Sequence, residues 1–214
     1  GGGRGDEDGG TEHGGAAGAE RGEVAVWGEA VMDSFEALVR LLLEQDGFWT
    51  RQSHKVNLSK AEKRAIGKPS IPRPEIDVIG FNPKENLIVA MEVKSLLDSP
   101  GVYASGLKEV HEVSHGLFKL FTSANYREIV FQGLRNDLTK VGLADENTTI
   151  RLGLAAGKIH KGDENELHDL FNSNGWLLWG PAELATRMKR LSALGYENDP
   201  FILSSKLIHR NPVE

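Results

Sequence analysis

The sequence predicts an α/β protein in which helices cover both faces of a mixed central β-sheet. Residues 74–94 read as a β-hairpin, because two runs rich in Ile and Val flank a turn that contains Asn and Pro. Residues 150–194 alternate between short apolar runs and segments with helical spacing of apolar residues. Alternating strands and helices produce parallel strands that are covered on both faces. A hairpin joined to such a unit makes the expected sheet partly antiparallel and partly parallel.

Composition limits the classes of protein that fit this prediction. The chain has 214 residues, a formal net charge of −6 and no Cys. The length suits one domain, and the lack of Cys excludes cysteine-ligated zinc and is typical of a cytoplasmic protein. No apolar run reaches membrane-spanning length, so no membrane partner is expected. With an acidic net charge, any binding of nucleic acid has to come from a local basic patch.

The first residues differ in composition from the rest of the chain. Residues 1–22 are rich in Gly and acidic residues and almost free of apolar side chains, so we expect a disordered tail. Residues 23–214 are expected to form a single domain with a helical extension from about residue 181.

An amphipathic helix is expected to start near Val24 and to end at Asp46 and Gly47. Its apolar residues recur at helical spacing: Trp27, Val31, Phe35, Leu38, Leu41 and Leu42. Its acidic positions include Glu29, Asp33, Glu36 and Glu44. Residues 48–53 then read as the first strand.

The hairpin carries charged residues at one end. Side chains alternate along a strand, so Glu92 and Lys94 share a face with Ile88 and Ala90, and pairing brings Asp77 beside Glu92. Charged groups on an apolar strand cost desolvation energy unless a partner or ligand compensates them. Two carboxylates beside a lysine suit a hard divalent cation and a polarised water. The alternative is an ordinary salt bridge at the end of a surface strand.

Two short segments of this hairpin carry a resemblance to a known family. Pro74-Glu75-Ile76-Asp77 followed by Met91-Glu92-Val93-Lys94 resembles the PD-(D/E)XK motif of the restriction-endonuclease-like superfamily. The Pro lies three positions before the Asp, at a place that is loose in the superfamily, and the ExK half is the more specific one. The resemblance covers roughly residues 27–180 and implies an αβββαβ core.

The resemblance implies a Mg²⁺-dependent endonuclease that hydrolyses phosphodiester bonds of DNA, with Mn²⁺ able to substitute. In the mechanism that the family implies, Asp77, Glu92 and the Val93 carbonyl hold the metal, and Lys94 orients or helps deprotonate the attacking water. The substrate would be duplex or branched DNA. A homodimer would supply the two active sites that cleavage of both strands requires.

The first helix adds one more acidic residue to this implied site. Nucleases resembling Holliday-junction resolvases carry a Glu in the first helix, three turns before a Gly that opens the first strand. Glu36 before Gly47 matches this pattern. The resemblance therefore implies Glu36 as a catalytic and metal-binding group, ahead of Glu29.

One stretch of this acidic protein is densely basic. It lies just before Asp77, contains the single acid Glu62, and carries Lys55, Lys60, Lys63, Arg64, Lys68 and Arg73. Basic side chains beside a metal site would attract the phosphate backbone, which supplies most sequence-independent affinity for DNA. A solvated loop is the alternative. Because the stretch is longer than a tight hairpin, we interpret it as an insertion.

A second motif competes with the nuclease hypothesis. Residues 107–121 show helical spacing and contain His111-Glu112-Val113-Ser114-His115, which matches the HExxH zinc motif of metalloproteases. A zinc protease needs a third protein ligand, and Glu128 is too close to serve in the long-spaced class. Zinc proteolysis remains an alternative, as does a catalytically inactive DNA-binding or assembly module of the same fold.

The second half of the chain completes the expected sheet. Residues 124–142 have helical spacing, although the apolar run 129–131 also fits a strand. Strands are expected at 150–157 and 176–179 and a helix at 164–174. Pro181 opens a last helix that is expected to reach Leu194.

Overall fold

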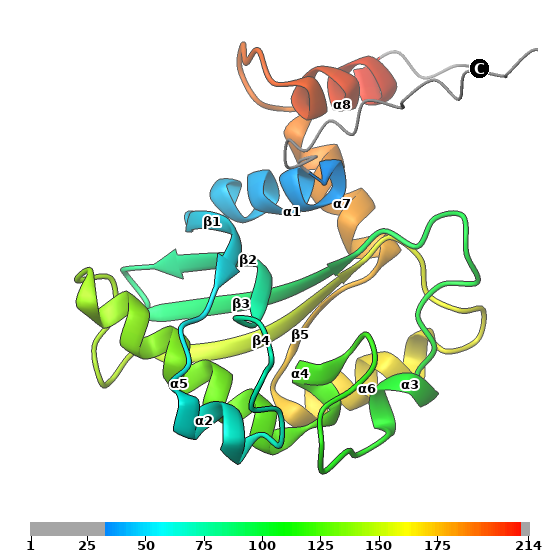
Figure 1. Ribbon diagram of the computed structural model, residues 1–214. Helices are drawn as coiled ribbons and strands as arrows, with labels where there is room; N and C mark the ends of the chain where they lie inside the picture. The colour runs from blue at the N-terminus through cyan, green and yellow to red at the C-terminus, as the bar shows by residue number, and fades with distance from the viewer. Residues whose placement is uncertain (1–32, 211–214) are drawn as a thin grey trace, which may run out of the picture. The chain divides into compact units, whose positions relative to one another are not determined.

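The computed structural model describes residues 33–210, which form the helices and strands of Figure 1. The strands are β1 (Trp49–Lys55), β2 (Glu75–Asn82), β3 (Leu87–Lys94), β4 (Thr149–Ala156) and β5 (Leu177–Trp179). The helices are α1 (Ser34–Gln45), α2 (Lys60–Ala65), α3 (Ser105–Lys108), α4 (Lys119–Thr122), α5 (Ala124–Lys140), α6 (Glu164–Asn174), α7 (Pro181–Leu191) and α8 (Pro200–Arg210). Trp27, Glu29, Val31 and the expected tail at 1–22 lie outside the described residues.

The five strands form one mixed sheet in the order β1-β2-β3-β4-β5. The pairs β1/β2 and β2/β3 are antiparallel, whereas β3/β4 and β4/β5 are parallel. The expectation of an α/β protein with a mixed sheet flanked by helices is therefore confirmed. Within residues 33–210, no helix is both long enough and apolar enough to cross a membrane.

The alternation of side chains along β3 separates two hydrophobic cores. Ile88 and Ala90 belong to a core on the face covered by α5 and α6, whereas Val89 and Met91 belong to a core on the face covered by α1 and α7. Figure 1 shows these two layers of helices on opposite sides of the sheet. Both faces of the central strands are buried, which explains why β3 begins as a continuous apolar run.

The first helix is shorter in the described residues than the sequence pattern predicts. It begins at Ser34, because the carboxylate of Asp33 accepts hydrogen bonds from the backbone N–H groups of Phe35 and Glu36 and caps the helix. The predicted turns from Val24 to residue 32 lie outside the described part of the chain. The helix ends at Gln45, close to the expected stop.

The predicted helix at residues 107–121 is wrong. Only the short α3 and α4 are helical there, and residues 109–118 have no helix. Of the apolar residues that gave the helical spacing, Val110, Val113 and Leu117 are exposed, whereas Leu107, Leu120 and Phe121 are buried within α3 and α4. An apolar face stabilises a helix only where it packs against a core, and the apolar side chains between α3 and α4 do not pack in this way.

The other elements agree more closely with prediction. The helix at 124–142 is α5 rather than a strand, and β4, α6 and β5 match the expected segments within two residues. The helix that opens at Pro181 ends at Leu191 rather than Leu194. A separate helix, α8, follows in the part of the chain that the resemblance left unassigned.

Candidate active site

The polar end of the hairpin forms around an interruption in strand pairing. The β2/β3 ladder ends at the pair Val78 and Met91. Beyond it, the backbone N–H of Val93 donates a hydrogen bond of 2.7 Å to Oδ2 of Asp77 instead of to a backbone carbonyl. The neighbouring strand β1 is distorted opposite Asp77, where Ser53 has a φ of 49°. The side chain of Asp77 therefore replaces a backbone acceptor at this point.

The ammonium of Lys94 lies between two carboxylates. Its Nζ is 2.7 Å from Oε1 of Glu92 and 3.1 Å from Oδ2 of Asp77. The same ammonium donates to the Val93 carbonyl at 3.1 Å. The structure thus brings together Asp77, Glu92, Val93 and Lys94, four residues that the sequence singles out.

Burial raises the cost of the charges in this cluster. Burial and the neighbouring Asp77 raise the pKa of Glu92, and they outweigh the opposing effect of Lys94. Burial also disfavours the charged form of Lys94, but Glu92 and Asp77 outweigh it and raise the pKa of this ammonium. Lys94 is therefore a cation in this site, and the two carboxylates share a single positive partner.

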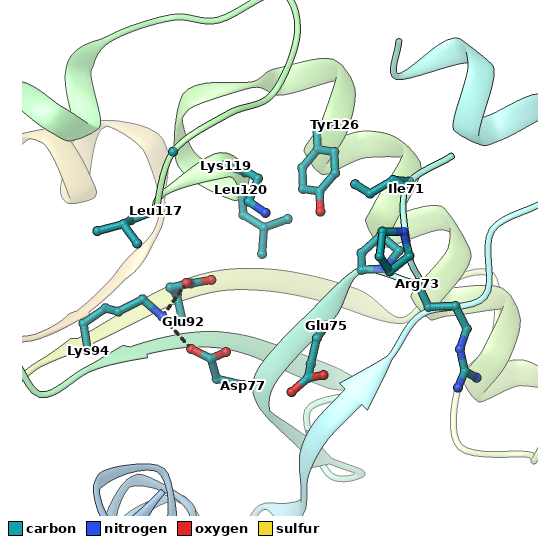
Figure 2. A pocket seen from close by; sticks show the side chains of 13 residues that line it. Ile71, Arg73, Glu75, Asp77, Glu92, Lys94, Leu117, Lys119, Leu120 and Tyr126 are labelled. Atoms are coloured by element: carbon teal, nitrogen blue, oxygen red, sulfur yellow. Dashed lines mark hydrogen bonds and ion pairs between the residues drawn. The ribbon is translucent and has the colours of Figure 1, made fainter. Parts of the chain in front are cut away.

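The cluster forms one wall of a cavity of about 390 Å³. Figure 2 shows Asp77, Glu92 and Lys94 on the sheet side of the cavity and Lys119 and Tyr126 on the opposite side. The remaining lining residues come from the starts of β2 and α4 and from the segments that precede them: Ile71, Pro72, Arg73, Pro74, Glu75, Gly116, Leu117 and Leu120. A substrate group in this cavity would lie between an acidic wall and a wall that carries a cation.

Glu36 approaches the cluster from the other side of the sheet. Its helix, α1, packs against the core on that face, and Glu36 does not line the cavity. Burial and the charges of Asp77 and Asp33, among others, raise the pKa of Glu36 to about 7. The carboxyl is therefore close enough to sense Asp77, but the structure does not bring it into the cavity with Glu92.

The donors present are compatible with a magnesium ion, although the geometry is not a complete ligand cage. Among residues 33–210, no group of three or more His, Cys, Asp and Glu side chains is placed to hold a metal. Asp77, Glu92 and the Val93 carbonyl all direct an oxygen to the Lys94 ammonium. Mg²⁺ takes oxygen ligands and keeps several waters, with one or two carboxylates from the protein. These residues therefore fit the ion that the motif implies.

The predicted phosphate-binding residues are only partly gathered at the cavity. Arg73 lines it, but its Nη1 donates to Oδ1 of Asn57 at 3.3 Å, and Figure 2 shows the guanidinium directed away from the acids. Lys55 lies 3.8 Å from Glu75 in an ion pair. The others do not line the cavity: Lys60, Lys63 and Arg64 on α2, and Lys68 after it. They lie outside the cavity.

The HExxH segment does not form the arrangement that its motif requires. His111 and His115 lie in the irregular segment between α3 and α4, with ring centroids 3.7 Å apart. Nε2 of His111 is 3.4 Å from the carboxylate of Glu109. The motif binds zinc through histidines one turn apart on a helix, and no helix is present here. Within residues 33–210 the structure therefore does not form the zinc site that the HExxH motif implies.

Three polar lining residues, Glu75, Lys119 and Tyr126, were missed by reasoning from sequence. Glu75 shares a strand face with Asp77 by simple alternation, so the pattern contained this signal. Lys119 and Tyr126 lie far along the chain from the motif and carry no local signal. They reach the cavity because α4 and α5 pack on the sheet face that holds the acids.

Comparison of the chain with protein-family models, with curated proteins and with solved structures gives no match. Any functional conclusion therefore depends on the geometry of the site and on the motif resemblance.

Proposed function

We propose that this chain is a metal-dependent DNA endonuclease with a restriction-endonuclease-like fold. The observation that supports this proposal is the convergence of Asp77, Glu92 and Lys94 in one cavity, at the end of paired strands. The element order, a helix followed by three antiparallel strands and then a parallel strand, is compatible with the αβββαβ core of that fold.

Asp77, Glu92 and the Val93 carbonyl would hold Mg²⁺ in this proposal, with Mn²⁺ as a substitute. When bound, the metal would stabilise negative charge that develops on the phosphate and on the leaving oxygen. The two carboxylates keep anionic groups away from the cavity until a cation compensates them.

Lys94 would orient the attacking water. Its pKa is raised, so the ammonium acts as a hydrogen-bond donor rather than as a base. Hydrogen bonds to the Val93 carbonyl and to Asp77 fix the position of the ammonium. Glu36 would act on the cluster through its charge, since it faces Asp77 from the other side of the sheet.

The basic stretch would bind the DNA backbone outside the cavity. Lys60, Lys63 and Arg64 lie on α2, on the same side of the sheet as the cavity-lining residues Leu120 and Tyr126. Contacts to phosphates of this kind position a nucleic acid without reading its sequence.

A cleavage assay tests the proposal. Linear duplex, branched and single-stranded DNA are incubated with Mg²⁺, with Mn²⁺ or with EDTA. We expect cleavage with either metal and none with EDTA, because two uncompensated carboxylates repel the phosphate. Asp77→Asn should lose both metal affinity and rate, while Lys84→Gln at the far turn of the hairpin should retain both.

The assay also separates the alternatives. Cleavage that survives chelation, or that returns only with zinc, would contradict the mechanism. DNA binding without cleavage under any metal would instead indicate an inactive DNA-binding module of the same fold.

A further inference from the structure

The wall of the cavity that faces the acids carries two polar groups that the proposed mechanism leaves unused. Lys119 begins α4, and Tyr126 lies in the first turn of α5. Figure 2 shows the hydroxyl of Tyr126 directed into the cavity and draws no hydrogen bond or ion pair from either group to another lining residue. Tyr126 is only 5% exposed, so its hydroxyl reaches the cavity from a buried ring.

These two groups provide a cation and a neutral donor. Burial and the charge of Glu92 raise the pKa of Tyr126 to about 12, so the hydroxyl keeps its proton near neutral pH. Lys119 lies close enough to lower the pKa of Glu92 slightly. A ligand that contacts both walls therefore needs anionic oxygens. These oxygens accept hydrogen bonds from Lys119 and Tyr126, and they bind the same cation as the carboxylates of the acidic wall. A phosphodiester has both properties.

The size and the lining of the cavity restrict which chemical groups can be attached to the bound phosphate. A volume of about 390 Å³ suits a single small unit, near the lower end of ligand cavities. Apolar side chains of Ile71, Pro72, Leu117 and Leu120 flank the polar walls. A base can contact such side chains only when it is neither paired nor stacked, because a duplex hides the faces of its bases.

We infer that the cavity binds one unpaired nucleotide of a DNA strand, with its phosphate held against Lys119 and Tyr126. The inference rests on the proposed function and specifies its substrate class. The scissile position lies in a single strand, a flap or a frayed end rather than within an intact duplex. Lys119 and Tyr126 are substrate-binding residues in this arrangement.

Binding of a fluorescein-labelled oligo(dT) strand, measured by fluorescence anisotropy, tests this inference without requiring cleavage. The measurement is made with Ca²⁺, which takes oxygen ligands, and with EDTA. Tyr126→Phe removes only the hydroxyl and keeps the buried ring, and Lys119→Gln removes only the charge. The matched controls are Tyr103→Phe and Lys140→Gln, which lie outside the cavity lining. Thermal melting checks that each variant is folded.

We expect both cavity variants to bind about 10- to 100-fold more weakly than the wild type, as loss of a hydrogen bond to a charged group does. The salt dependence distinguishes the two. Lys119→Gln should lower the log–log slope by about 0.7, since the variant neutralises one phosphate fewer on a single strand, whereas Tyr126→Phe should leave the slope unchanged. The wild type should also bind oligo(dT) more tightly than a blunt duplex.

Unchanged affinity and slope in both cavity variants would overturn the inference, as would tighter binding of the duplex or no binding of oligo(dT) at all. The proposed function fails separately. If the strand binds through Lys119 and Tyr126 but is not cut with Mg²⁺ or Mn²⁺, the inferred binding of an unpaired nucleotide stands, and the nuclease proposal falls together with the scissile position. If DNA is cut while both variants bind the strand like the wild type, the nuclease proposal stands and the inference about Lys119 and Tyr126 falls.

Discussion

The two ends of the β2/β3 hairpin both carry polar clusters, but only one of them is self-contained. At the turn end, Oγ1 of Thr148 donates to Oδ1 of Asn86 at 2.8 Å and accepts from the backbone N–H of Asp145 at 2.8 Å. Arg135 donates to the Thr148 carbonyl. At the other end, Asp77 and Glu92 share the ammonium of Lys94.

The pKa shifts at the two ends have opposite directions. Hydrogen bonds from Asn86 and from the backbone of Asn147 lower the pKa of Asp145. Burial and like charge raise the pKa values of Glu92 and Glu36. A carboxylate whose charge is stabilised by hydrogen bonds within the protein has a structural role. Two carboxylates that share one ammonium retain uncompensated negative charge and are suited to bind an external cation. The difference predicts that substitutions at the end with Asp77 and Glu92 mainly affect the cleavage rate, and that substitutions at the turn end mainly affect the stability of the fold.

The largest effect is expected for Lys94→Ala. The DNA cleavage rate should fall about 10²- to 10⁴-fold, the usual cost of losing a group that handles a proton or positions water. DNA affinity should change far less. In EDTA, the variant should also melt at a lower temperature, because two mostly buried carboxylates lose their cation. Cleavage kinetics, DNA binding and thermal melting measure the three quantities.

Lys84→Ala is the matched control at the turn end and should leave rate, affinity and melting temperature unchanged. If Lys94→Ala cuts at the wild-type rate, the strand pair is only structural and the two ends do not differ in function.

The second prediction concerns the basic residues of α2. Replacing Lys60, Lys63 and Arg64 together with Gln should weaken duplex DNA binding and reduce the log–log salt slope by about 0.9 for each phosphate that the variant no longer neutralises. Replacing Lys84, Lys140 and Arg151 removes the same charge elsewhere and should have a smaller effect on the slope. Equal slopes for the two triple variants would mean that net charge, not location, determines binding.

At the turn end, Thr148→Val should destabilise the fold by about 0.5–1.5 kcal/mol without changing the cleavage rate, because it removes the hydrogen bonds of the hydroxyl to Asn86 and Asp145. Thr148 itself is 1% exposed, but Asn86 is half-buried and Asp145 is exposed, so water can replace part of what is lost. Urea unfolding measures the loss. Thr139→Val, an exposed position on α5, should cost almost nothing; a slower cleavage rate in Thr148→Val alone would show that the two ends are coupled.

The smallest effect is expected for Glu36→Gln. The pKa of Glu36 is about 7 in the folded protein against an ordinary value of 4.5. Between these values the folded protein holds a proton that the unfolded chain releases, so this contribution to stability is complete below pH 4.5 and is lost as the pH rises through 7. Thermal melting in EDTA across this range should show a shallower decline in the variant.

The exposed Glu128→Gln serves as the control and should retain the wild-type decline. A residual decline is expected in Glu36→Gln as well, because the pKa of Glu92 is also raised. If Glu36→Gln declines as steeply as the wild type between pH 4.5 and 7, Glu36 does not have the raised pKa that its burial and the charge of Asp77 predict.

The sequence predicted those features of the fold that depend on neighbouring residues along the chain. The hairpin and its polar end follow from the alternation of side chains in β2 and β3, and this was enough to place Asp77 beside Glu92. Alternation would also have indicated Glu75. The spacing in 107–121 misled, because Val110, Val113 and Leu117 repeat at helical intervals but have no core to pack against.

The opposite wall of the cavity could not be predicted in the same way. Lys119 and Tyr126 face the acids only because α4 and α5 pack across the sheet, and the polar atoms of these residues leave no periodic trace in the sequence. Tyr126 reads as one more apolar position of a helix. Only the tertiary structure shows that its hydroxyl lies in the cavity and can bind a ligand.

The hydrogen bond from the Val93 N–H to Asp77 has an evolutionary consequence. A descendant of this chain that abandoned catalysis would still need an acceptor at position 77 to close the end of the β2/β3 pair, and Asp or Asn would satisfy it. Glu92 and Lys94 hold no backbone group of a neighbouring strand through their side chains, so selection for folding would not preserve the pair once both are replaced together by neutral side chains. Among descendants of this chain, an acid at position 77 would therefore indicate only that the fold is retained. Glu92 and Lys94 retained together would indicate that the activity is retained.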